Sequence, residues 1–304
     1  MINGMNVKEA LAAGVVIAAS LTAIGLLFAS SALPGDSLQA KRPHETSMPY
    51  LPESMDFCGE VVPLDRQDVR ESFEREIIAN TFLHSSTILN IKRSGRYFPQ
   101  IEEILNEQGL PDDLKYLCVA ESNLIPTIGS PAGARGLWQF MEGTAKDYGL
   151  VVNDEIDERM NVQKSTRAAC KMLRDNYLKL GSWSLTAAAY NGGLARVRRR
   201  MDEQYQHNYY DILWTEETAR YVFRILAYKA IMQSPAKYGF DINDCDKYAP
   251  IETRTVNLPT PQADLARWAI DNGSTYKELR SLNPWIVKSS IRRSFDSLQV
   301  ELHK

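Results

Sequence analysis

One glutamate, Glu121, is predicted to lie on the apolar face of a helix. The helix begins at Pro111 with two acidic residues after it, in the turn where the helix dipole favours negative charge. Leu114, Leu117 and Cys118 share one helical face, and Glu121 follows on that face. A carboxyl group held against apolar neighbours has a raised pKa and can donate a proton near neutral pH. Position alone leaves two interpretations open, a structural buried glutamate or a proton donor.

Four sequence blocks around and after Glu121 resemble one enzyme family. They are Glu121-Ser122, residues 130–141 (SPAGARGLWQFM), residues 187–193 (AAAYNGG) and residues 216–222 (EETARYV). Their order and spacing resemble those of the soluble-lytic-transglycosylase catalytic domain, the family that cleaves bacterial murein and is related to goose-type lysozyme. The run from residue 147 to residue 161 resembles the form usual in membrane-bound lytic murein transglycosylases of the D type. The resemblance covers roughly residues 66–245.

The resemblance implies a lysozyme-like, all-helical catalytic domain and a reaction that uses one carboxyl group. Glycosidases usually need two carboxylates beside the scissile bond. In this family a single glutamate, here Glu121, would protonate the leaving oxygen and then deprotonate the C6 hydroxyl that attacks the anomeric carbon. The product would be a 1,6-anhydro-muramyl sugar, with no cofactor and no metal. The motif match assigns substrate contacts to Ser130, Gln139, Met141, Tyr190, Asn191, Glu217 and Tyr221.

Some of these roles are specific expectations. Tyr190 should contact Glu121 or the reacting sugar, and Asn191 should hold the start of a helix. Glu217 should lie deeper in the cleft as a sugar ligand, while Tyr221 should add a wall. For both tyrosines, an ordinary place in the aromatic core is the alternative.

Two other functions compete with a lytic transglycosylase. A lysozyme-like hydrolase of the same bond would need a second acid to activate water, and Asp147, Asp154 and Asp157 are the candidates near in sequence. A membrane-tethered protein that binds murein without cleaving it is the other alternative. A protein that only binds has no need of a proton donor, so the presence of Glu121 argues against it.

The amino-terminal sequence predicts export. Residues 10–33 carry no charge and are long enough to cross a bilayer as a helix. Residues 1–33 are therefore predicted to be a membrane anchor or a signal segment, which places the rest of the chain in the cell envelope, in the periplasm at the inner membrane. Residues 34–64 contain five prolines among polar residues and are predicted to form an extended tether. A protein that begins near Asp65 should then be soluble, monomeric and active.

The remaining sequence predicts two further parts. Residues 65–247 follow a helical period almost throughout, with predicted helices that include residues 165–180, 185–199 and 216–232. Residues 248–304 predict a strand, two helices and a strand, and this small α+β module resembles a degenerate LysM-type glycan-binding module. Its usual turn motif is missing, so a role as a structural cap packed on the catalytic domain is the alternative to glycan binding.

Composition limits the partners and the cofactors. The net charge of −3 gives no case for nucleic acid, so peptidoglycan glycan strands are the expected partner. The four cysteines show no spacing typical of a zinc site, and no metal site is predicted. Cys58 and Cys245 flank the catalytic region and could form a disulfide in an oxidising compartment, but sequence does not fix connectivity.

Overall fold

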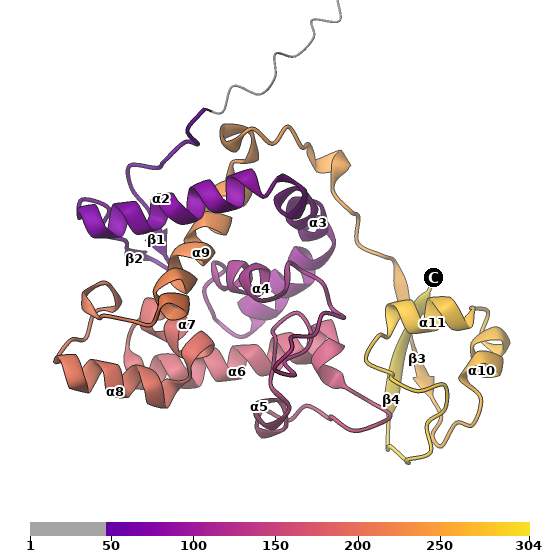
Figure 1. Ribbon diagram of the computed structural model, residues 1–304. Helices are drawn as coiled ribbons and strands as arrows, with labels where there is room; N and C mark the ends of the chain where they lie inside the picture. The colour runs from indigo at the N-terminus through magenta and orange to yellow at the C-terminus, as the bar shows by residue number, and fades with distance from the viewer. Residues whose placement is uncertain (1–46) are drawn as a thin grey trace, which may run out of the picture. The chain divides into compact units, whose positions relative to one another are not determined.

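The computed structural model describes residues 47–304 (Figure 1). The predicted anchor at residues 1–33, including the apolar run 10–33, and the first part of the tether lie outside the described residues. Between residues 47 and 304, none of the helices combines the length and the apolar character that a membrane span requires.

The predicted fold class, mainly α with a small α+β module, is confirmed. The catalytic part contains two short strands and eight α-helices, in the order β1 (Asp56–Phe57), β2 (Glu60–Val61), α2 (Gln67–Phe82), α3 (His84–Glu107), α4 (Leu114–Ser122), α5 (Glu142–Asp147), α6 (Val162–Leu180), α7 (Trp183–Gly192), α8 (Leu194–Gln204) and α9 (Glu216–Gln233). The helix predicted over residues 185–199 is in fact two helices. Gly193 separates α7 from α8 with a φ of +87°, a conformation that side chains disfavour.

Helix α9 lies against several other helices of the catalytic part. It packs on α2, α4 and α7 (Figure 1), and its buried residues include Tyr221, Val222, Ile225 and Leu226. A helix that is apolar on most of its circumference must be surrounded by other elements. The position of α9 brings its side chains to the end of α4, where Glu121 lies.

Part of the predicted tether belongs to the folded core. Residues 56–61 form an antiparallel hairpin, and the Phe57 side chain is fully buried. The amine of the buried Lys229 on α9 lies 3.1 Å from an Asp56 carboxylate oxygen and 2.8 Å from one of Asp113. The extended tether predicted up to residue 64 therefore does not extend that far, because the hairpin fills a place in the core.

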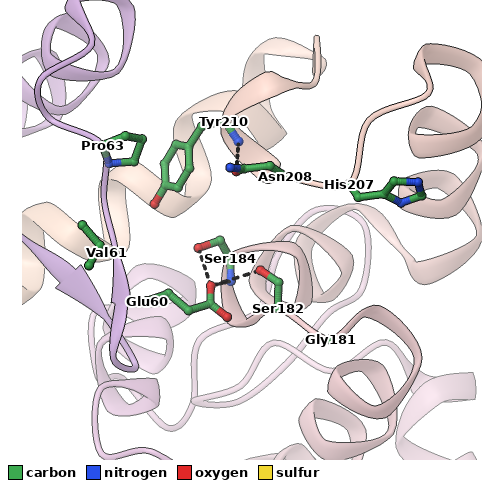
Figure 2. A pocket seen from close by; sticks show the side chains of 9 residues that line it. All are labelled: Glu60, Val61, Pro63, Gly181, Ser182, Ser184, His207, Asn208 and Tyr210. Carbon is green, nitrogen blue, oxygen red and sulfur yellow. Dashed lines mark hydrogen bonds between the residues drawn. The ribbon is translucent and has the colours of Figure 1, made fainter.

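The hairpin also caps α7. The Glu60 carboxylate accepts hydrogen bonds from the backbone nitrogens of Trp183 and Ser184 and from the hydroxyls of Ser182 and Ser184. Figure 2 shows this carboxylate pointing at both serines, in a pocket of about 390 Å³ that Tyr210 also lines. A carboxylate at a helix amino terminus satisfies unpaired N–H groups and favours the helix dipole.

The carboxy-terminal module has the predicted order of strand, helix, helix and strand. Strands β3 (Thr253–Leu258) and β4 (Leu298–His303) pair antiparallel with Val256 opposite Val300, and α10 (Leu265–Asp271) and α11 (Tyr276–Leu282) lie between them in the chain. The module has its own apolar cluster, which also contains Ile156 and Met160 from the catalytic part. The expectation that the module contacts the catalytic part is thus met, and glycan binding by the module stays a prediction.

All four cysteines lie within the described residues, and all are free. Cys58 is half-buried in the hairpin, while Cys245 is exposed. The disulfide considered between them is therefore not formed in this structure.

We predict that a fragment of residues 48–304 is more stable than a fragment of residues 65–304. Removing the hairpin opens the space that Phe57 fills, which costs about 3–5 kcal/mol for an aromatic core residue, and it leaves the start of α7 without Glu60. Thermal unfolding followed by circular dichroism should show a lower melting temperature for the shorter fragment. Phe57→Ala in the longer fragment should reproduce part of the loss. Equal melting temperatures for the two fragments would contradict this assignment.

Candidate active site

Glu121 lies in the last turn of α4 and is half-buried. The helix ends there because Asn123 and Leu124 both adopt left-handed backbone conformations, with φ of +50° and +54°. Leu117 and Cys118, one turn before, are fully buried, so the apolar face predicted for this helix is present. The helix end thus holds a carboxyl group at the edge of the core.

The hydroxyl of Tyr221, on α9, donates a hydrogen bond to the Glu121 carboxylate. The Tyr221 side chain is 1% exposed, so the core fixes its position. Burial raises the pKa of Glu121 from 4.5 to about 7. The Tyr221 hydrogen bond and the charge of Arg224 oppose this rise, whereas the charge of Glu217 adds to it. Glu121 is therefore suited to donate and accept a proton near neutral pH.

An ion-pair network joins α9 to α2 near Tyr221. The guanidinium of Arg224 is 3.1 Å from a Glu217 carboxylate oxygen and 3.8 Å from one of Glu76. Glu76, on α2, is 1% exposed and also accepts a 2.7 Å hydrogen bond from Arg220. Sequence analysis missed Glu76 and Arg224. Glu76 could have been found as a charged residue within the apolar period of α2. Arg224 could have been found from its position three residues after Tyr221.

Tyr190 lies close to Glu121, but its hydroxyl has another partner. It donates a 2.7 Å hydrogen bond to the backbone oxygen of Trp138, and its ring packs edge-on against Trp138 and Phe140. Burial, followed by the charge of Glu121, raises the pKa of Tyr190 well above its ordinary value. Tyr221 is therefore the tyrosine that hydrogen-bonds Glu121. Tyr190 lies close to Glu121 but hydrogen-bonds the segment that carries Gln139.

Ser130 and Gln139 belong to one tight loop, residues 128–140, which we call the substrate loop. The Ser130 hydroxyl accepts a hydrogen bond from the backbone nitrogen of Ala134 at 3.1 Å. The Gln139 amide donates to the backbone oxygens of Gly136 at 2.8 Å and Ile128 at 3.3 Å. These contacts order the loop, and both side chains are half-buried rather than covered completely.

The other predicted substrate residues differ in exposure. Met141 is 47% exposed at the start of α5. Asn191 accepts a 3.3 Å hydrogen bond from the Thr218 hydroxyl in the first turn of α9. Glu217 is 62% exposed at its side chain and pairs with Arg224, so it does not lie as deep as expected. Long charged side chains in the first turn of a helix remain in water unless another element covers them.

The aspartates considered for a hydrolase are not placed for that role. Asp147 is exposed at the end of α5. Hydrogen bonds from Lys288 and Arg293 lower the pKa of Asp154 to about 2, and Asp157 is buried in an ion pair with Arg159 at 2.8 Å. Among residues 47–304, no group of three or more histidine, cysteine or acidic side chains could hold a metal ion.

Two parts of the chain match models of known protein families. Residues 99–213 match the family model of the transglycosylase SLT domain. The chain carries a transglycosylase SLT domain. Six predicted site residues fall inside the match, while Glu217 and Tyr221 lie beyond its end. Residues 254–297 match the soluble lytic transglycosylase C-terminal LysM-like domain, which confirms the resemblance of the module.

Two named proteins are similar in sequence to this chain. The chain is 28% identical over 246 residues to membrane-bound lytic murein transglycosylase D of Escherichia coli K12, an alignment that covers 78% of this chain and 53% of the relative. It is 34% identical over 117 residues to peptidoglycan transglycosylase gp16 of Escherichia phage T7, covering 38% and 9%. The chain thus spans about half the length of the Escherichia coli relative.

Among solved structures, the 70 kDa soluble lytic transglycosylase of Escherichia coli is similar over 50% of this chain and 26% of that one. The sequence identity is 23% and the TM-score is 0.40.

The raised pKa of Glu121 predicts a pH-dependent stability difference between the protein and Glu121→Gln. The folded state favours the neutral carboxyl, so its contribution is complete below pH 4.5 and is lost as the pH rises through about 7. The amide of glutamine has no such dependence. The melting temperature of the variant relative to the wild type should rise between pH 4.5 and 8, by an amount that corresponds to at most about 3 kcal/mol. A constant difference across this range would show that Glu121 titrates normally.

Proposed function

We propose that this protein is a lytic murein transglycosylase, which cleaves the β-1,4 bond between N-acetylmuramic acid and N-acetylglucosamine without water. The observation that carries the proposal is the half-buried Glu121 carboxyl, hydrogen-bonded by the buried Tyr221, in a segment that matches the transglycosylase SLT domain. Tyr221 fixes the direction of the carboxyl, and burial supplies a pKa of about 7. Both properties are needed by a group that donates and then accepts a proton.

The reaction balances with one carboxyl group. Neutral Glu121 gives its proton to the glycosidic oxygen as the bond from that oxygen to the anomeric carbon breaks, and the bond electrons remain on the oxygen. The C6 hydroxyl of the same muramyl sugar then forms a bond to the anomeric carbon, and its proton returns to Glu121. Because the nucleophile belongs to the substrate, proximity replaces much of the entropic cost of a second reactant. The product is the 1,6-anhydro-muramyl sugar.

Ser130, Gln139, Met141 and Glu217 supply the sugar contacts in this proposal. Ser130 and Gln139 hydrogen-bond the N-acetyl and hydroxyl groups around the cleaved bond, while the exposed Met141 lines the cleft. Tyr190 holds the loop against α7 through Trp138. Glu217 contacts sugar from the exposed start of α9 and, with Arg224, adjusts the field at Glu121.

The geometry favours this reaction over the two alternatives. A hydrolase would need a free second carboxylate to activate water, and Asp154 and Asp157 are held in ion pairs. A protein that only binds murein has no use for a carboxyl group with a pKa of about 7, because burying a titratable group destabilises the fold when it ionises.

The place of action is the cell envelope in this proposal. The uncharged apolar run at residues 10–33 supports attachment to the inner membrane, with the enzyme in the periplasm as a monomer acting on glycan strands. The name of the Escherichia coli relative, which describes a membrane-bound murein enzyme, supports the same location.

We predict that purified protein converts murein to products that end in 1,6-anhydro-muramyl sugars. Each such product is lighter by one water than the hydrolysed equivalent, so mass spectrometry distinguishes the two reactions. Glu121→Gln should lower the rate by at least about a hundredfold, because an amide of similar shape cannot transfer the proton. Asp147→Asn, on the exposed end of α5, is the matched control and should leave the rate unchanged.

Hydrated reducing ends would instead establish a hydrolase. Intact murein after long incubation with the wild type, together with retained binding, would establish a protein that only binds.

A further inference from the structure

A buried arginine that is not part of the substrate loop, Arg159, hydrogen-bonds the backbone of that loop. Its side chain is 6% exposed, and one guanidinium nitrogen, Nη1, donates to the backbone oxygens of Gly133 at 2.9 Å and Phe140 at 3.2 Å. These two carbonyls belong to the turn that contains Ser130 and to the end of the loop beside Gln139. Arg159 thus contacts the loop at two points, three residues after Ser130 and one residue after Gln139.

The backbone of Arg159 is in equally close contact with the loop. Gly136 has a φ of +82°, and a Cβ atom at this position would lie 1.7 Å from the Arg159 carbonyl oxygen. Only glycine permits this approach. The loop therefore rests directly on the turn formed by residues 158–160.

Asp157 fixes the direction of the Arg159 guanidinium. The two side chains form a bidentate pair, with Nε and Nη2 of Arg159 each 2.8 Å from a different carboxylate oxygen. The Asp157 side chain is 7% exposed. Bidentate pairs constrain geometry more strongly than single contacts do, so Nη1 is held toward the loop carbonyls.

The segment that carries Asp157 is in turn held by the carboxy-terminal module. The backbone nitrogen of Asp157 donates to the Trp285 oxygen at 2.8 Å, and the nitrogen of Val287 donates to the Glu155 oxygen at 2.7 Å. Ile156, between them, is fully buried in the apolar cluster of the module.

The Glu155 side chain adds a second attachment to the module. It is 6% exposed, and its carboxylate accepts hydrogen bonds from the backbone nitrogens of Arg292 at 3.1 Å and Arg293 at 3.2 Å. A buried carboxylate with two backbone donors is costly to disrupt, because its loss leaves buried polar groups unpaired. The carboxylate therefore joins residue 155 to a second segment of the module, beyond the one that contains Trp285.

We infer that Arg159 is a positioning residue for the substrate loop, and that the carboxy-terminal module holds this loop in place through residues 155–159. The module thereby acts on catalysis without contacting the reacting sugar. The effect of the module on catalysis rests on the proposed function. The structural coupling between the module and the substrate loop does not depend on that function. A continuous set of buried and partly buried polar contacts carries the coupling. It runs from Trp285 to Asp157 and from Arg292 to Glu155, and then from Arg159 to Gly133 and Phe140.

The first test replaces Arg159 with lysine in the full-length protein. Arg159→Lys keeps the charge opposite Asp157, but one ammonium group cannot form the bidentate pair and also reach both loop carbonyls. We expect kcat/KM on murein to fall by about tenfold, through loss of one or two hydrogen bonds, and amide hydrogen exchange in residues 128–140 to become faster. Lys171→Gln is the control, since Lys171 is an exposed side chain on α6, outside the segments that this test concerns, and it should change neither quantity. Unchanged exchange in the loop of Arg159→Lys would overturn the positioning role.

The second test weakens only the attachment of the module. Glu155→Gln removes one acceptor from the pair of backbone nitrogens and leaves Arg159 and Asp157 intact. We expect faster exchange both in residues 285–293 and in residues 128–140. Faster exchange in the module alone would overturn the coupling, as would no change in either segment. If the wild-type protein formed no anhydro product, the proposed function would be refuted. The exchange measurements would still test the coupling between the module and the substrate loop.

Discussion

A carboxyl group kept partly out of water, at the end of a helix, is the constraint on which the catalytic part of this protein depends. The Glu121 side chain lies beside fully buried Leu117 and Cys118, where the ionised form is disfavoured. One hydrogen bond, from Tyr221, compensates part of this cost and fixes the direction of the carboxyl. The helices that bring α4 and α9 together therefore determine both the pKa and the geometry of the proposed proton carrier.

The buried charged side chains of the catalytic part are paired with side chains of opposite charge. Glu76 is buried but faces Arg220 and Arg224, and Lys229 is buried but faces Asp56 and Asp113. Isolated buried charges are strongly destabilising, whereas paired ones fix relative positions. The first pair ties α2 to α9 near Tyr221, and the second ties the amino-terminal hairpin to the same helix. The position of α9 is thus set by ionic contacts as well as by apolar packing.

Local signals predicted much of this arrangement from the sequence. The apolar period of α4 predicted the setting of Glu121, and the sequence of residues 248–304 predicted the strand, two helices and strand of the module. Signals that depend on distant partners were not readable. Phe57 is in a proline-rich segment without a period, and only its contact with the folded helices shows that it belongs to the core. The role of Arg159 likewise depends on carbonyls some twenty residues away in sequence.

The resemblance of short motifs identified residues but not their partners. It assigned contacts to both Tyr190 and Tyr221, yet the choice of the tyrosine that bonds Glu121 depends on how α9 packs against α4 and α7. It placed Glu217 deep in the cleft, whereas the exposed first turn of α9 leaves that side chain in water. The order of the motifs can be read from the sequence. Which side chains contact one another depends on how the helices pack.

The most direct measurement is the titration of Glu121 itself. Carbon-13 chemical shifts of the side-chain carboxyl, assigned by comparison with Glu121→Gln, report its protonation at each pH. Burial of the carboxyl predicts a midpoint near 7, and in Tyr221→Phe the midpoint should rise further because the hydrogen bond to the ionised form is lost. A midpoint near the ordinary value of 4.5 would contradict the account, since the carboxyl would then be ionised at neutral pH and could not begin the reaction as an acid.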